Sequence, residues 1–344
     1  MPPKGGTKSS STAAATPQPA ARVFTIPPGE PFLPALARAV LTGQLPKPGG
    51  QPPDPLDLPE ITLLLPTRRA ARALQEAFRE ASGKSAVLLP KIRPIATADE
   101  DLMLLSGLVD AAETPAAIPP AISELERRLV LTQLVLKWAQ TIAVYDDDPL
   151  APPPYVGASM STPAQAASLA KELGRFIDMV ETEGAELSKL HELVPDTFSE
   201  HWQKTLRFLE IIVDWWPEYL RERGLLSPME RRNRLIRAEA QRLIANPPSG
   251  PVIVAGVTGS IPATAELMQV VLGLENGAIV LPGLDQMLDD AGWAAVHAHP
   301  EHPQHGLAKL LSRLNVPREA VRPLPNLATH KAKSARARLI SEAL

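Results

Sequence analysis

The chain has 344 residues and a mass of 37.0 kDa, and 44% of its residues are hydrophobic, so it is long enough and apolar enough to bury a large core. Its 35 basic and 38 acidic side chains give a net charge of −3, which excludes an overall positive field for nucleic acid and leaves only local patches for such a role. The absence of cysteine excludes disulfides, thiolate zinc sites and iron–sulfur clusters within these residues and fits a cytoplasmic protein. No apolar run approaches the ~20 residues that a membrane-spanning helix needs.

The N-terminal part of the chain begins with a polar stretch. Residues 1–21 are rich in Ser, Thr, Ala and Pro without a sustained apolar segment, which predicts a disordered leader rather than a secretory signal. The run RVFTI over 22–26 predicts a short strand that ends at Pro27, and the apolar spacing of residues 32–41 then predicts a helix.

Two further strand signals follow. The continuous apolar run ITLLL over 61–65 is typical of a strand buried on both faces. Thr67 can cap a helix over 68–81, and the short run over 86–89 predicts a third strand that ends at Pro90. Repeated strand–helix units of this kind predict an α/β fold with a parallel sheet and covering helices.

The middle of the chain has helical spacing and no convincing strand signal. We expect helices over residues 122–144, 163–183, 197–223 and 228–245. The strand pattern returns at 252–255, and a helix over 262–274 and a strand over 278–281 follow it. The chain therefore leaves an α/β layer, builds a mostly helical insertion and returns to the layer.

These elements divide the chain into five parts. The end, SARARLISEAL, is a good helix former without a stop signal, so we expect the chain to be a piece of a longer protein that is cut within a helix. The predicted parts are a disordered leader at 1–21, the first part of the α/β domain at 22–115, a helical subdomain at 116–246, a return to the α/β domain at 247–330 and the start of a truncated helix at 331–344.

The positions at which an ATPase holds its nucleotide carry unsuitable residues. The turn PPGEPF after the first strand contains Pro28 and Gly29, lacks a lysine, and includes Glu30, which would repel phosphates. The later buried strand ends in Ala255-Gly256, where a phosphoryl-transfer ATPase has a carboxylate that holds Mg²⁺. Pro28, Gly29 and Gly256 therefore mark a vestigial nucleotide site without ATPase activity.

Two other motifs have plainer interpretations. Gly83-Lys84-Ser85 looks like the end of a phosphate-binding loop, but it follows a helix and precedes a strand, so we expect an ordinary helix C-terminal turn. Four histidines lie within the nine residues from His297 to His305, which leaves a metal site open, although the prolines between them favour a solvated loop.

Two local basic runs remain. Residues 66–93 hold seven basic side chains against two acidic ones. Arg68, Arg69 and Arg72 fall in the first turns of a helix after a strand, where helix N–H groups could join the guanidinium groups on a phosphate. Residues 221–242 hold seven arginines against three glutamates. A solvated helix face is the alternative for both runs, and it is favoured more strongly for the second because amphipathic helices commonly carry charges in this way.

Several phrases of the sequence resemble a known family. LLLPTRRAARAL, over residues 63–74, resembles the strand and following T-x-x-A-A block with which superfamily 1 helicases touch single-stranded DNA. Together with LLPKIRPI, AGVTGSIPAT, VLPGLD and HPQHGL, it resembles AddB, the double-strand-break repair subunit of AddAB helicase–nucleases, in its alphaproteobacterial form. The resemblance covers nearly all of residues 22–344.

This resemblance implies a RecA-like, superfamily 1 helicase-type parallel sheet with a helical inserted subdomain and no motor function. It implies that Thr67, Arg68, Arg69 and Arg72 contact DNA, as single strands and duplex ends, and that the partner is an AddA-type helicase–nuclease subunit in recombinational repair. An iron–sulfur cluster and Mg²⁺ would belong to a nuclease domain that lies outside these residues, so we expect neither a cofactor nor a separate enzymatic activity here. The open alternative is a non-catalytic α/β scaffold that mediates only protein–protein contact.

Overall fold

The computed structural model of the chain describes residues 22–47, 49–84, 86–95, 118–145, 162–185, 208–209, 211–259, 261–325, 335 and 338–339. Its centre is a six-stranded sheet in which every neighbouring pair of strands is parallel, in the order β3-β2-β4-β5-β1-β6. The strands are β1 (Val23–Ile26), β2 (Thr62–Leu65), β3 (Lys91–Pro94), β4 (Val252–Ala255), β5 (Gly277–Pro282) and β6 (Arg322–Pro323). The predicted α/β fold with a parallel sheet is confirmed, and it is compatible with a RecA-like sheet.

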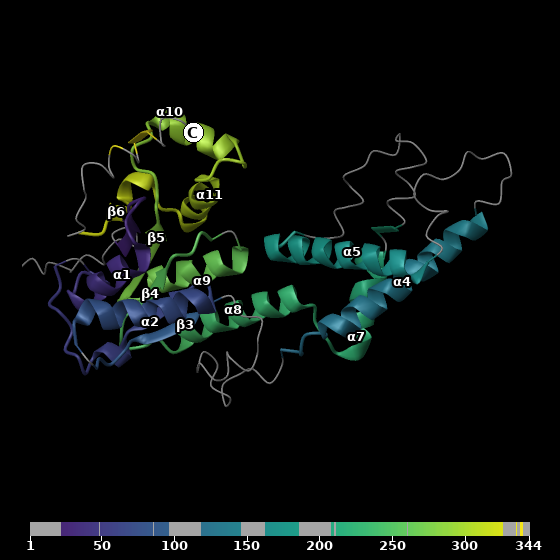
Figure 1. The fold of residues 1–344 in the computed structure, drawn as a ribbon, viewed down its shortest axis with the longest axis horizontal. Coiled ribbons are helices and arrows are strands. Elements are labelled where there is room, and N and C mark those ends of the chain that lie inside the picture. Colours follow the sequence, from purple (N-terminus) through teal and green to yellow (C-terminus); the bar gives the residue numbers. More distant parts are fainter. Residues whose placement is uncertain are drawn as a thin grey trace, which may run out of the picture.

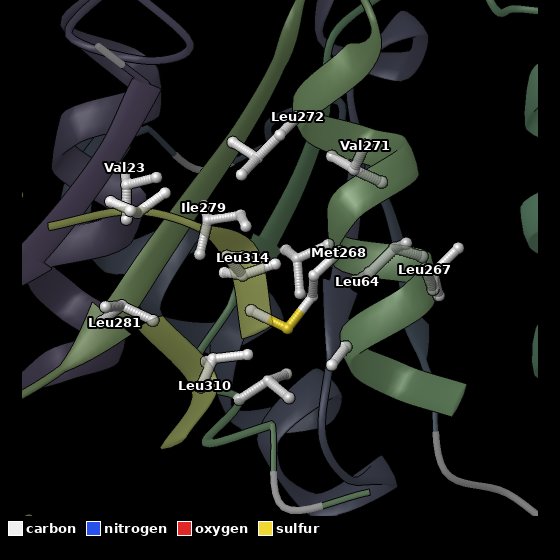
Figure 2. Packing of buried hydrophobic residues seen from close by; sticks show 14 of the residues in the cluster. Val23, Leu64, Leu267, Met268, Val271, Leu272, Ile279, Leu281, Leu310 and Leu314 are labelled. Carbon is white, nitrogen blue, oxygen red and sulfur yellow. The ribbon is translucent and has the colours of Figure 1, made fainter. Parts of the chain in front are cut away.

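Both faces of the sheet are covered because its central strands are apolar on both sides. Alternate residues of β2 and β4 point to opposite faces, so Leu63 and Ile253 join one buried cluster while Leu64 and Val254 join the other. The first cluster is covered by α1 (Phe32–Leu41) and α2 (Arg68–Ser82), and the second by α9 (Pro262–Gly273), α11 (His305–Leu314) and part of α8 (Pro228–Ala245). Figure 2 shows the second cluster, in which Met268 of α9 lies among Leu64, Ile279 and Leu314.

The helical insertion forms a lobe with a core of its own. We call α4 (Glu124–Tyr145), α5 (Pro163–Glu183), the π-helical turn Ile211–Trp215 and α7 (Trp216–Arg223) the helical lobe. Leu131, Leu173, Ile212 and Trp216 are buried together in its core, which is separate from the two sheet clusters. Figure 1 shows this lobe beside the sheet, with α8 running between the two.

Most predicted elements agree with the structure, and one strand was predicted wrongly. The third strand is Lys91–Pro94 rather than 86–89, because the backbone N–H of Lys91 bonds to the carbonyl of Ile61 and thereby fixes the ladder with β2 to the later residues. Residues 86–89 have no regular structure, and Val87 and Leu89 pack against the cluster beneath α1 and α2. Two helices were missed, namely α10 (Asp290–Ala298) and α11.

Some predictions fall outside the described residues. These are the leader at 1–21, the first part of the helix expected over 197–223 and nearly all of the helix expected after residue 333. Among the described helices, none is both long enough and apolar enough to cross a membrane. Gly83 ends α2 in the left-handed conformation, with φ of 62°, which confirms the predicted helix C-terminal turn.

Candidate nucleic-acid interface at the carboxyl edge of the sheet

The carboxyl ends of the parallel strands meet at one edge of the sheet, where the following helices begin. Neighbouring strands β2 and β4 lead to α2 and α9, which cover opposite faces of the sheet. The chain therefore leaves the ends of β2 and β4 toward opposite faces of the sheet. The same holds for β1, which leads to α1, and for β5, which leads toward α11. Open α/β sheets bind their ligands at such topological switch points, so this edge is the first place to look for a site.

The turn after β1 has few amide donors for a phosphate. The N–H of Glu30 is already bonded to the carbonyl of Pro27 at 3.2 Å, and Gly29 has φ of 85°. Helix α1 begins directly after Pro31 and carries Pro34 in its first turn, so neither of these positions has an N–H to offer. A phosphate-binding loop depends on successive amides at this place.

The space beside this turn is occupied by side chains. A β-carbon added at Gly256 would lie 3.1 Å from Cε1 of Phe32, and one added at Gly283 would lie 3.8 Å from Cγ of Pro28. Strand β4 ends at Ala255 without a carboxylate. The structure thus brings Pro28 and Gly256, two of the residues predicted to mark a vestigial nucleotide site, to the same sheet edge, with an aromatic ring packed against one of them.

The N-terminus of α2 is organised differently, because a side chain caps it. The hydroxyl oxygen of Thr67 accepts a hydrogen bond from the N–H of Ala70 at 3.1 Å, as the sequence predicts. Arg69 and Arg72 are exposed one helical turn apart, whereas Arg68 is half-buried. Among the described residues, neither Arg69 nor Arg72 has an ion-pair or hydrogen-bond partner.

The first basic run is not one continuous surface. Arg79 is bound to Glu76 on the same helix, and that hydrogen bond lowers the pKa of the Glu76 carboxyl. Lys84 follows the end of α2 and Lys91 begins β3, so both lie toward the amino edge of the sheet. The basic groups at the carboxyl edge are therefore those of the first turns of α2, together with the half-buried Arg93 near the end of β3.

The second basic run is used within the structure. Its exposed or half-buried arginines form ion pairs with nearby glutamates, and Arg231 and Arg232 are buried. This pairing supports a structural role for the run. The pairs are Arg221 with Glu218, Arg223 with Glu126, Arg234 with Glu230, Arg237 with Glu266 and Arg242 with Glu239.

The histidines of the 297–305 segment do not converge on one point. Nδ1 of His299 faces Glu301 at 3.2 Å, Nδ1 of His305 faces the carbonyl of Val296 at 3.0 Å, and Nδ1 of His302 accepts from the N–H of Gln304 at 3.1 Å. No group of three or more His, Cys, Asp or Glu side chains in the described part of the chain could hold a metal ion.

The sequence analysis did not single out two charged residues that the structure places against other elements, the buried Arg22 and the half-buried Glu181. Arg22 is 5% exposed, and its guanidinium donates to the carbonyls of Leu272 and Glu275 at 2.7 and 2.8 Å, which caps the C-terminus of α9. Glu181, near the end of α5, accepts a hydrogen bond from the hydroxyl of Ser227, and burial raises the pKa of its carboxyl to about 7. A charged residue next to a strand or at a helix end looks solvent-exposed in a sequence, so neither pattern gave a signal.

Compared with known protein families and with curated proteins, the chain matches no family and no curated relative. The site is therefore interpreted from its own residues, which are a capped, arginine-rich helix N-terminus and, at the same edge of the sheet, the proline-rich turn after β1 with the ring of Phe32 against Gly256.

Proposed function

We propose that this chain is the DNA-binding, ATPase-inactive, helicase-like part of an AddB-type subunit of a helicase–nuclease that processes double-strand DNA ends. The observation that carries the proposal is the exposed pair Arg69 and Arg72, which lies at the N-terminus of α2 and lacks an acidic partner among the described residues. Guanidinium groups beside helix N–H groups favour phosphate oxygens. The partner in this proposal is an AddA-type subunit that supplies the ATPase.

The residues around the turn after β1 and the end of β4 support the part of the proposal that concerns the lack of ATPase activity. Prolines replace amide donors in the turn before α1, and the ring of Phe32 packs where Gly256 leaves room. A phosphoryl-transfer site needs a phosphate cradle and a carboxylate for Mg²⁺, and β4 ends in Ala255 instead. The chain would thus guide DNA for a partner that consumes ATP, and we expect no ATP turnover from the chain alone.

The test is binding of a fluorescent oligothymidine single strand, followed by anisotropy at a series of salt concentrations. The double variant Arg69→Ala/Arg72→Ala removes the two proposed phosphate contacts. We expect weaker binding at low salt and a decrease of about 1.4 in the salt slope, because each phosphate neutralised on a single strand contributes ~0.7. Arg68 is left intact because it is half-buried.

The matched control is Arg234→Ala/Arg237→Ala, which removes the same charge from the second basic run. These arginines are paired with Glu230 and Glu266, so their loss should leave DNA binding unchanged. An equal loss of binding in both double variants would mean that only net charge matters, and it would contradict a site on α2. No binding by the parent chain would favour the scaffold function.

The scaffold candidate has one observation of its own. A groove of about 690 Å³ lies at the amino edge of the sheet, between the C-terminal ends of α1 and α2. Leu56 and Leu88 line it and are 76% and 47% exposed. Exposed apolar side chains that are gathered in one groove, as these two are, favour a protein contact surface. Mutation of Leu56 and Leu88 to Ser should leave DNA binding intact if the α2 site is the functional one.

A further inference from the structure

Helix α8 passes through two different environments along its length. Ile236, Ala240 and Leu243 in its later turns are buried in the sheet cluster with α9. Its first turns instead face α5 of the helical lobe through polar side chains, and the described residues of the lobe core belong to a separate cluster. The lobe is therefore attached to the sheet domain by a polar joint.

Three hydrogen bonds hold the last turn of α5 against the beginning of α8. The side-chain amide of Asn233 donates to the carbonyl of Glu181 at 2.9 Å, and the guanidinium of Arg232 donates to the hydroxyl of Thr182 at 3.2 Å. The hydroxyl of Ser227 donates to the carboxylate of Glu181. Glu181 therefore takes part through both its backbone and its side chain.

The surroundings of the joint contain a natural pivot. Gly224, with φ of 63°, ends α7, and only the short segment 225–227 separates it from α8. The other contacts of the α5 end with the sheet domain are a weak ion pair, in which Nζ of Lys309 lies 3.6 Å from the carboxylate of Glu183 with both side chains nearly half exposed, and the approach of Gly184 to the ring of Pro262. Loss of the α5–α8 contacts would leave the lobe joined to α8 through this segment, in which Leu226 pairs with the strand-like residues 120–122, and through the hydrogen bond from Arg231 to the carbonyl of Pro119 at 3.0 Å, so that the end of α5 could move away from α8.

Charged groups surround the Glu181 carboxyl from three helices. Arg127 of α4 and Arg232 of α8 favour its ionised form, whereas Asp178 of α5 and Glu230 of α8 oppose it. Burial is the largest influence and raises the pKa of Glu181 to about 7 despite the hydrogen bond from Ser227. The carboxyl thus keeps its proton in the closed joint under conditions in which an exposed glutamate is ionised.

We propose that the α5–α8 joint is a pH-sensitive hinge, in which the protonated Glu181 carboxyl keeps the helical lobe docked on α8 and ionisation favours undocking. Desolvation of the half-buried Glu181 carboxylate is costly, and separation of α5 from α8 would expose it further to water. The docked-to-open ratio should fall by up to tenfold for each pH unit between about 4.5 and 7. The proposal is independent of DNA binding.

Hydrogen exchange of the whole chain between pH 5 and pH 8, corrected for the intrinsic exchange rate, tests this directly. Protection of the amides in the last turn of α5 and the first turns of α8 should fall 10- to 100-fold relative to the amides of β4 and β5 as the pH rises. In Glu181→Gln, a neutral side chain of the same shape, this pH dependence should disappear. If the protection of the joint amides and of the sheet amides changes equally with pH, the proposal is wrong.

Two further variants keep the test decisive. Glu172→Gln changes an exposed carboxylate of α5 that is paired with Arg175, and it should retain the full pH dependence. Ser227→Ala removes the hydrogen bond that lowers the pKa of the docked Glu181 carboxyl, so the pH up to which protection keeps falling should move upward, while protection is lower at every pH because the joint has lost a hydrogen bond. If Ser227→Ala leaves that pH unchanged, or if Glu172→Gln abolishes the dependence, Glu181 is not the titrating group.

Discussion

The ring of Phe32 lies against Gly256, so that a β-carbon at residue 256 would be 3.1 Å from Cε1 of the ring. The first residue of α1 thus packs directly on the residue that follows β4, although 224 positions separate them along the chain. In a nucleotide-binding α/β protein this space lies between the phosphate loop and the metal-binding strand end. Here the space carries an aromatic packing contact.

Substitution of Gly256 should therefore be costly in two ways. Gly256 has φ of 71°, a conformation that costs an L-residue about 1–2 kcal/mol, and Gly256→Ala adds a contact with Phe32. Gly29→Ala is the matched control, because Gly29 has φ of 85° and nothing lies within 4 Å of its added β-carbon. Urea unfolding should find Gly256→Ala less stable than Gly29→Ala. Equal losses of stability in the two variants would mean that the Phe32 ring moves away from the added methyl group at no cost in free energy.

The cap of α2 gives a second stability prediction. Thr67→Ala removes the acceptor for the N–H of Ala70 and should lower the free energy of unfolding by about 1 kcal/mol. Thr67→Ser keeps the hydroxyl and should stay close to the parent in chemical denaturation. If the serine variant loses as much stability as the alanine variant, the methyl group rather than the hydrogen bond is what matters at residue 67.

The regular elements could be predicted from the sequence because their signals are local. Four-residue apolar runs such as VIVA at Val252–Ala255 are bounded by turn residues, and α5 and α8 match their predicted bounds. Strand β3 was misplaced because its sequence KIRP is polar and holds a proline, so only pairing with β2 defines it. Helices α10 and α11 were missed because the histidines and prolines between them suggested one long loop.

The site was only partly accessible to sequence reasoning. The sequence predicts a capped helix that begins with arginines, but it cannot tell that Arg69 and Arg72 are exposed while Arg68 is half-buried. The sequence favours a solvated face more strongly for the second basic run, but it cannot show the ion pairs that occupy this run, because some of them join different helices, such as Arg237 with Glu266. Tertiary packing decides which charges remain available to a ligand.

Arg22 allows a third prediction about buried charge. Its guanidinium binds carbonyls at the end of α9, and burial lowers its pKa. Arg22→Met would fill similar space but leave those carbonyls without donors, which should cost roughly 2–3 kcal/mol. Arg22→Lys keeps the positive charge but has fewer hydrogen-bond donors, so it should lose less stability than Arg22→Met. Thermal unfolding compares the variants, and a fully stable methionine variant would show that water can replace the guanidinium.

The stability of the whole chain should depend on pH through Glu181. The pKa of its carboxyl is about 7 in the folded chain, compared with 4.5 for an unperturbed glutamate. Because the folded state binds this proton more tightly than the unfolded state, the stability from this group is complete below pH ~4.5 and is lost as the pH rises through about 7. The whole loss is on the order of 3 kcal/mol, since one pKa unit corresponds to 1.36 kcal/mol.

Urea unfolding at pH 5 and at pH 8 measures this loss, and Glu181→Gln isolates it. The glutamine variant avoids the cost of a partly desolvated carboxylate and can still accept a hydrogen bond from Ser227 through its amide oxygen. It should therefore be more stable than the parent at pH 8 and close to it at pH 5. A variant that is less stable than the parent at pH 8 would mean that the ionised carboxylate, attracted by the charges of Arg127 and Arg232, stabilises the joint instead.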